Sequence, residues 1–185
     1  MTTRTQRQEK VHASHRSLQW AFVAAITAAL VFFLFVVWFS PISMANQSMY
    51  STINAGDMLL YNRLAKFSRP IRRGEMIVFQ HPFTREHLIK RVIALGGERV
   101  CIENGRVIIN GKYQLDESSY CTSVDFNLSE REVPKGEVFV LSDSRAHKDD
   151  SRDGRIGCVP LENILGIVQL RINRFTVFST TQVKT

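Results

Sequence analysis

Two residues of the chain have the chemistry of a base and a nucleophile. Lys90 lies inside an aliphatic run, residues 87–95, that is typical of a buried strand. Burial removes water from the ammonium group and lowers the pKa of a lysine by up to about 3–5 units, which produces a neutral amine that can act as a general base. Ser48 supplies a hydroxyl group, and a serine activated by a neutral lysine is one form of nucleophilic catalysis. The pair therefore predicts acyl-transfer chemistry.

Both residues also have an ordinary structural interpretation. A lysine at a strand end can remain partly exposed and pair with a carboxylate, and a serine in a loop is usually only a loop residue. In an extended strand, however, Lys90 shares a face with Leu88 and Val92. Lowering its pKa by three units would cost about 4 kcal/mol of folding free energy, which a purely structural position would tend to avoid.

The elements that must position these residues are mostly strands. Asn-Gly pairs at 104–105 and 110–111 favour tight turns, so residues 100–115 are predicted to form a three-stranded meander. Residues 112–135 are polar and are predicted to be a surface loop or a small excursion. We expect a mostly β fold, an antiparallel barrel-like or coiled sheet domain with one N-terminal transmembrane helix. The remaining predicted strands are short apolar runs bounded by polar residues, Pro or Gly, at 58–64, 75–80, 88–95, 137–141 and 164–172.

Residues 20–39 carry no charge and are long enough to cross a bilayer, since twenty helical residues span roughly 30 Å. Positive residues precede this segment, so the N-terminus is predicted to stay in the cytoplasm. The expected organisation is a basic tail at 1–17, an anchor at 18–40 and an extracytoplasmic catalytic domain at 41–185. A cleavable signal peptide is the alternative, although its apolar region would be shorter.

The composition limits the partners that we expect. The net charge is +7, but no basic helix or zinc-finger spacing supports nucleic-acid binding, and a mild positive excess suits a surface above anionic lipid. No cluster of Cys and His indicates a metal, and we expect no cofactor. Cys101 and Cys121 could form a disulfide outside the cytoplasm, or they and Cys158 could be free thiols.

Several blocks of the sequence resemble, in order, those of the bacterial type I signal peptidases, which are membrane-anchored Ser/Lys proteases that remove signal peptides from exported proteins. The resemblance covers nearly all of residues 41–172 and the preceding anchor. The blocks that carry it are "NQSMYSTI" (46–53), "RRGEMIVF" (72–79), Lys90-Arg91-Val92, "INGK" (109–112), "VPKGEVFVLSDSR" (133–145) and "GCVPLENILG" (157–166).

The resemblance implies a role for each residue of the first blocks. Ser48 aligns with the family nucleophile and Lys90 with its general base. The backbone N–H of Ser48 would form part of the oxyanion hole, where each donor is worth roughly 3–4 kcal/mol in the transition state. Asn46 stands where the family has a serine that supplies the second donor, and its side-chain amide can also donate.

The resemblance also implies the partners. Small subsites near Ser48 and Ile89, with Met49, would accept the small-x-small motif at the end of a signal peptide. Met49 and an apolar surface formed by residues such as Phe79 or Phe83 are expected to dip into membrane lipid.

The last block departs from the family pattern. The family serine that hydrogen-bonds the catalytic lysine is replaced by Lys148. We expect Lys148 to point to solvent and another group, or water, to orient Lys90. Asp150 and Arg152 are expected to form an ion pair that braces the site, and Asp143 to support the fold beside it.

Two functions remain open from the sequence. The first is an active signal peptidase in the bacterial plasma membrane, either a housekeeping enzyme or one devoted to a few substrates such as pilins. The second is a non-catalytic relative, an anchored assembly factor that binds exported proteins without cutting them. Because Ser48 and Lys90 are both present, the sequence favours the enzyme. A Ser-His mechanism using His147 is a less favoured rival to the Ser-Lys pair.

Overall fold

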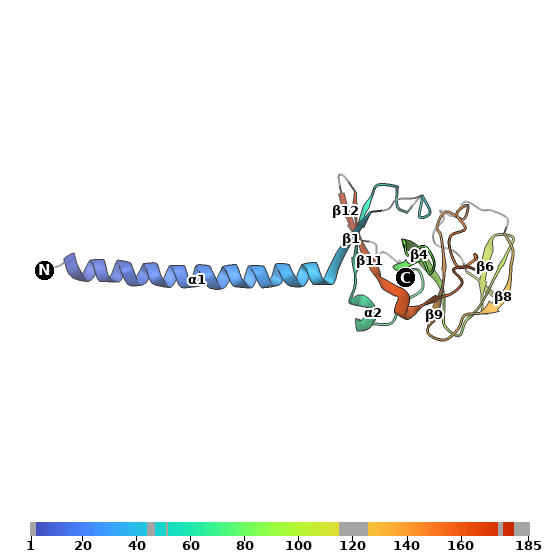
Figure 1. Ribbon diagram of the computed structural model, residues 1–185, viewed down its shortest axis with the longest axis horizontal. Helices are drawn as coiled ribbons and strands as arrows, with labels where there is room; N and C mark the ends of the chain where they lie inside the picture. Colours follow the sequence, from blue (N-terminus) through green and yellow to red (C-terminus); the bar gives the residue numbers. More distant parts are fainter. Residues whose placement is uncertain (1–2, 44–46, 51, 115–125, 174–175, 180–185) are drawn as a thin grey trace. The chain divides into compact units, whose positions relative to one another are not determined.

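The computed structural model describes residues 3–43, 47–50, 52–114, 126–173 and 176–179 of the chain. The chain divides into two compact units, Met1–Trp38 and Phe39–Thr185. The first is the single helix α1 (Thr3–Trp38), and the second is built of strands (Figure 1).

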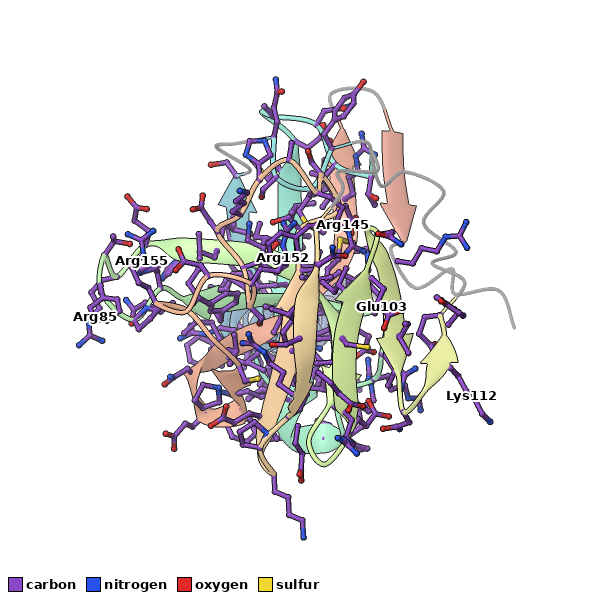
Figure 2. All side chains as sticks on the ribbon, turned by 90° about the vertical axis from the view of Figure 1, so that its right-hand side faces the viewer. Arg85, Glu103, Lys112, Arg145, Arg152 and Arg155 are labelled. Carbon is purple, nitrogen blue, oxygen red and sulfur yellow. The ribbon has the colours of Figure 1, made fainter. Side chains whose placement is uncertain are left out.

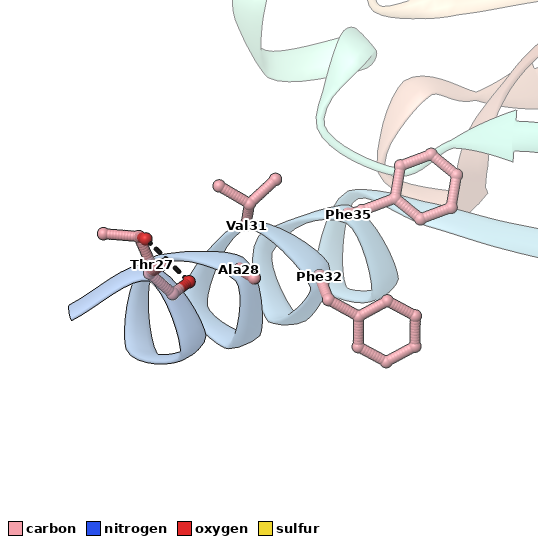
Figure 3. A pocket seen from close by; sticks show the side chains of 6 residues that line it. Thr27, Ala28, Val31, Phe32 and Phe35 are labelled. Carbon is pink, nitrogen blue, oxygen red and sulfur yellow. Dashed lines mark hydrogen bonds between the residues drawn. The ribbon is translucent and has the colours of Figure 1, made fainter. Parts of the chain in front are cut away.

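Helix α1 contains a segment, Leu18–Trp38, that is long and apolar enough to cross a membrane, with a mean hydropathy of 2.6 over its most apolar window. Thr27 is the polar residue near the middle of this segment (Figure 3). Its hydroxyl group is hydrogen-bonded within the helix, to the carbonyls of Val23 and Ala24, both at 2.9 Å. Phe32 and Phe35 extend from the helix in the same view. The apolar helix predicted at 20–39 is therefore present, and it ends one residue earlier than predicted.

The main sheet is antiparallel, and its strand order brings distant parts of the chain together. Strands β2 and β3, which are close in sequence, do not pair with each other, because β11 lies between them. The path of pairing is β1-β2-β11-β3-β4-β9-β10, and β12 pairs with β11. Its strands are β1 (Phe39–Ser43), β2 (Met58–Asn62), β3 (Met76–Gln80), β4 (His87–Leu95), β9 (Glu137–Leu141), β10 (Val159–Pro160), β11 (Ile164–Asn173) and β12 (Thr176–Ser179).

The second sheet has the order β7-β6-β5-β8. The Asn-Gly turns form as predicted, since Asn104 and Asn110 both adopt positive φ, at 49° and 51°. Its strands are β5 (Arg99–Glu103), β6 (Arg106–Ile109), β7 (Lys112–Tyr113) and β8 (Leu128–Glu132). Two short helical segments, α2 (Ala65–Ser68) and η1 (Leu161–Asn163), complete the described elements.

The prediction of a mostly β, antiparallel fold is confirmed, but neither described sheet closes into a barrel. Residues 112–135 are not a loop throughout, because β8 lies within this range. Strand β8 pairs with β5 although its Leu128 is the only buried residue in the strand. Strands β1 and β12 were also not predicted. Cys101 carries a free thiol, whereas Cys121 lies outside the described residues.

The core consists of three clusters of buried apolar side chains. Leu88 and Val92 of β4 belong to one cluster, whereas Ile89 belongs to another. This division agrees with the alternation expected of a strand, and it places Lys90 among fully buried positions at the centre of β4.

Candidate active site

The register of β4 and β9 places a hydroxyl group opposite Lys90. Arg91 pairs with Leu141 in this antiparallel ladder, so Ser142, the residue after β9, stands across from Lys90. Directly opposed residues of neighbouring strands have Cβ atoms about 4.5–5.5 Å apart. Accordingly, Lys90 Nζ donates a hydrogen bond of 2.9 Å to Ser142 Oγ. On its other side Lys90 pairs with Ile77 of β3, which offers it no polar group.

The Lys90 side chain has no contact with solvent, since the residue is 0% exposed. Burial lowers the pKa of Lys90 from its ordinary value of 10.5 to about 8, and the positive charge of Arg152 adds to this decrease. Asp150, Asp149 and Asp143 act in the opposite direction, because their carboxylates favour the ammonium form. The result is an amine that is largely neutral above about pH 8, as a general base requires.

Asp150 and Arg152 form the expected ion pair, and its two side chains are 0% and 3% exposed. Both carboxylate oxygens of Asp150 accept hydrogen bonds, from Arg152 and from the backbone N–H of Ser142 at 2.9 Å. Burial alone would raise the pKa of the Asp150 carboxyl, but the hydrogen bonds and charge of Arg152 outweigh it and hold that pKa below its ordinary value. The pair therefore fixes the backbone at Ser142, and with it the hydroxyl that Lys90 contacts.

The Arg152 guanidinium also holds the loop that follows β9. It donates to the backbone carbonyl of Arg145 at 2.9 Å and to that of His147. Arg145 is itself buried, at 7% exposure. Figure 2 shows the contrast with Arg85 and Arg155, whose side chains extend away from the domain.

Ser48 begins a turn after β1 and is only 1% exposed. The turn is closed by its own backbone, since the N–H of Ile53 donates to the carbonyl of Met49 at 2.8 Å. The carbonyl of Ser48 accepts a hydrogen bond of 2.9 Å from the N–H of Ser144. Ser48 and Lys90 thus both contact the segment 142–144, whose ends are at most about 7 Å apart along the backbone.

A second ion pair ties the Ser48 turn to β4. The Arg91 guanidinium donates to both carboxylate oxygens of Asp143, through Nε at 2.7 Å and through Nη2. Thr52, from the turn, donates its hydroxyl to the same carboxylate at 2.7 Å. Asp143 therefore joins the turn, β4 and the segment after β9, and its role in supporting an active site stays a prediction.

A third contact reaches the turn from β11. Arg171 Nη1 donates to the carbonyl of Thr52 at 2.6 Å. Its Nε lies 2.7 Å from Asp57 Oδ2, which is an ion pair, although the angle at Nε does not meet that of a hydrogen bond. Asp57 also accepts from the N–H of Asn54 at 2.9 Å. The part of the turn from Thr52 to Asp57 is thus held by buried or half-buried charges.

The expected subsite residues, Met49 and Ile89, are both buried. Met49 and Ile89 are 0% and 3% exposed and belong to the same apolar cluster. The expectation that Met49 and Phe79 reach lipid is wrong, because both are packed in the core, whereas Phe83 is 72% exposed. The role of Met49 and Ile89 in substrate binding stays a prediction.

The other residues predicted for the site are Lys148, His147 and Asn46. Lys148 is exposed. The hydrogen bonds described for His147 are made by its backbone, through its N–H to Ser144 and through its carbonyl to Arg152. Asn46 lies outside the described residues. Among those that are described, no group of three or more His, Cys, Asp or Glu side chains could hold a metal ion.

Sequence reasoning missed Ser142, Thr52 and Arg171. Ser142 had one signal, since it directly follows a predicted strand, but that signal becomes useful only when the strand's partner and register are known. Arg171 lies 119 residues from Thr52, and no local pattern links the two.

Comparison with known proteins gives a consistent result. The model of the family "Signal peptidase, peptidase S26" matches residues 17–173. Signal peptidase I of Bacillus caldolyticus is 34% identical over 178 residues, which is 89% of this chain and 94% of that protein. Signal peptidase I of Leptolyngbya laminosa is 36% identical over 134 residues, 68% of this chain and 64% of that protein. A crystal structure of a signal peptidase I from Enterococcus faecalis V583 covers 54% of this chain and 97% of its own, at 28% identity and a TM-score of 0.46.

Proposed function

Because the chain belongs to the signal peptidase family, peptidase S26, we propose that it cuts signal peptides from exported preproteins with Ser48 as nucleophile and Lys90 as general base. The observation that carries the proposal is Lys90 itself, a lysine with 0% exposure and a pKa lowered to about 8. Such a group is costly to bury, and it is poised to accept a proton near neutral pH. Its hydroxyl partner would be Ser48, which contacts the same short segment, 142–144.

The proposed reaction proceeds in two steps. Lys90 accepts the proton of the Ser48 hydroxyl while Ser48 Oγ attacks the carbonyl carbon at the cleavage site. Lys90 then returns the proton to the leaving amine as the peptide bond breaks, which leaves an acyl-enzyme. In the second step Lys90 takes a proton from water while the water oxygen attacks the ester carbonyl. Lys90 then returns this proton to Ser48 Oγ as the ester bond breaks, which releases the peptide with a free carboxyl group and restores the Ser48 hydroxyl.

The developing oxyanion needs hydrogen-bond donors. We assign the backbone N–H of Ser48 as one donor and the side-chain amide of Asn46 as the second. Each such donor lowers the barrier by roughly 3–4 kcal/mol. The contact between the Gln47 carbonyl and the N–H of Tyr50, at 3.1 Å, supports the first assignment, since that carbonyl and the Ser48 N–H belong to the same peptide plane.

The proposal includes a topology. The family is membrane-anchored, and this chain carries an apolar N-terminal helix of the right length. We propose that residues 1–17 are cytoplasmic, that 18–40 cross the plasma membrane and that 41–185 carry the catalytic domain outside, where they meet preproteins beside the lipid. Four Lys or Arg residues precede the span and none occurs in residues 39–58 directly after it, which supports this orientation.

A narrowed substrate range, for example pilins, is the finer part of the proposal. It is supported by two residues that differ from the family pattern: Gln47 stands where the family has a glycine beside the nucleophile, and Lys148 stands where it has a serine in the last block. A panel of preproteins that differ only in the residues before an Ala-x-Ala site tests it, and equal kcat/KM values across the panel would contradict it.

The test of the main proposal uses the full chain, purified in detergent, and a preprotein whose signal peptide ends in Ala-x-Ala. We expect a single cut after this motif, and we expect Ser48→Ala and Lys90→Ala each to abolish it. Ser129→Ala is the matched control, because Ser129 is exposed on β8 and distant from the site, and it should retain full activity. Cleavage that survives Lys90→Ala, or that is lost instead with His147→Ala, would refute the proposed base. Binding of the preprotein without a cut would favour an assembly factor.

A further inference from the structure

Ser142 has no role in the reaction as proposed so far, yet it makes the most direct polar contact with Lys90. Its Oγ lies 2.9 Å from Lys90 Nζ, and both residues are 0% exposed. Its hydroxyl is therefore closed off from bulk water. Its backbone is fixed as well, because its N–H donates to Asp150 Oδ2 at 2.9 Å.

We propose that Ser142 is the positioning residue of the general base, whose hydroxyl holds the Lys90 amine in the orientation that serves Ser48. This inference rests on the proposed function. In this chain Lys148 replaces the family serine that hydrogen-bonds the catalytic lysine, and Lys148 is exposed. Ser142 is then the group that orients Lys90.

The reason is the geometry of a primary amine. A neutral amine has two N–H bonds and one lone pair, and the group rotates freely about the terminal C–N bond unless a hydrogen bond holds it. Donation of one N–H to Ser142 Oγ fixes that rotation and directs the lone pair toward a second partner. On the β3 side Lys90 pairs with Ile77, which cannot share this role.

The charged groups around Lys90 do not replace the hydroxyl. Asp143, Asp149, Asp150 and Arg152 all act on Lys90 through their charges. The carboxylate of Asp150 is already engaged by Arg152 and by the Ser142 N–H, and that of Asp143 by Arg91 and Thr52. They set the local potential, whereas the described hydrogen bond of the amine itself goes to Ser142.

The first test is the kinetics of Ser142→Ala in the full-length enzyme. Alanine keeps the backbone N–H that Asp150 binds, so the fold should persist. We expect kcat to fall about 10²-fold, as for a misplaced reacting group, with KM unchanged within about twofold. The ammonium form loses an acceptor, so the acid limb of the pH–rate profile should also move by about one unit to lower pH. A merely structural defect would lower the rate equally at every pH.

Two further variants sharpen the result. Ser142→Thr retains the hydroxyl and should recover most of the rate and the position of the acid limb. Ser129→Ala removes an exposed hydroxyl from the second sheet and should change neither. The proposal would be overturned if Ser142→Ala had the kcat of the wild type and the same acid limb in its pH–rate profile. It would also be overturned if Ser142→Thr were folded but had a kcat as low as that of Ser142→Ala.

The second test does not depend on cleavage. The pKa of Lys90 is read by NMR from the ¹³Cε resonance, assigned by its loss in Lys90→Met. We expect Ser142→Ala to lower this pKa and Ser142→Thr to restore it. An unchanged pKa in Ser142→Ala would overturn the contact. If the wild type cuts no preprotein but the pKa responds, the proposed function fails while the positioning of Lys90 by Ser142 stands.

Discussion

Replacing Lys90 by methionine should make the protein more stable near neutral pH while abolishing its activity. Methionine has a similar length and carries no charge to desolvate. The depression of the Lys90 pKa from 10.5 to about 8 corresponds to about 3 kcal/mol of folding free energy that the buried ammonium costs. The substitution also leaves the Ser142 hydroxyl without its partner, which costs about 1 kcal/mol. We therefore expect a net gain of about 2 kcal/mol at pH 6.

The gain should disappear at alkaline pH. Because the folded-state pKa of Lys90 lies below the unfolded one, the unfolded chain binds more protons between pH 8 and pH 10.5, and the stability of the wild type rises with pH in this window. Between pH 6 and pH 9.5 the wild type should recover about 2 kcal/mol relative to the variant.

Pulse proteolysis in urea measures these free energies in detergent, whereas tryptophan fluorescence would report only on α1, which holds both Trp20 and Trp38. Lys112→Met is the matched control, because Lys112 also lies in a strand but extends into solvent (Figure 2). Its unfolding free energy should stay within about 0.5 kcal/mol of the wild type. A Lys90→Met protein less stable than the wild type at pH 6, or a difference that does not vary with pH, would refute the desolvation argument.

Three further predictions concern the rate and the framework. The value of kcat/KM should rise with pH through about 8 and then level, because only the neutral Lys90 amine accepts a proton, and a pH–rate profile with an acid optimum would contradict this. Gly166→Ala should lower the unfolding free energy, measured by urea titration, by about 3 kcal/mol, because its Cβ would lie 2.5 Å from the carbonyl oxygen of Asn62. Gly154→Ala is the control: its Cβ would lie in open space, so the same titration should show a change of less than about 0.5 kcal/mol. Asp150→Ala should cost about 3–5 kcal/mol by leaving Arg152 buried and unpaired, and a thermal midpoint within about 2 °C of the wild type would argue against it.

The strands that the sequence predicted are those with a strong local pattern. Residues 137–141 form β9 with the predicted bounds, and both Asn-Gly turns occur where they were placed. Strand β8 was missed because four of its five residues are polar or charged, and it forms by pairing with β5 rather than through burial of its own side chains. Local periodicity carries no information about such an edge strand.

The same distinction holds for the candidate site. Alternation along one strand, which is a local property, placed Lys90 on the face of Leu88 and Val92, whereas a partly exposed lysine was still an open alternative, and the structure decides for burial with 0% exposure. Its partner Ser142 is 52 residues away, and the register that brings the two together also depends on an irregularity between Val92 and Ala94. Single-sequence reasoning could therefore say that Lys90 needs an orienting group, but it could not say which residue supplies it.

The position of β11 between β2 and β3 has a consequence for the order in which the domain is completed during synthesis. The Ser48 turn is synthesised early, but Arg171, which binds Thr52 and Asp57 of that turn, is synthesised only about 120 residues later. Until then the two halves of the main sheet have unpaired neighbouring edges and the turn lacks its anchor on that side. The Ser48 turn therefore gains its contact with β11 only after β3, β4 and β9, which lie between the two in sequence, have been synthesised, so the main sheet cannot be completed in the order of the chain.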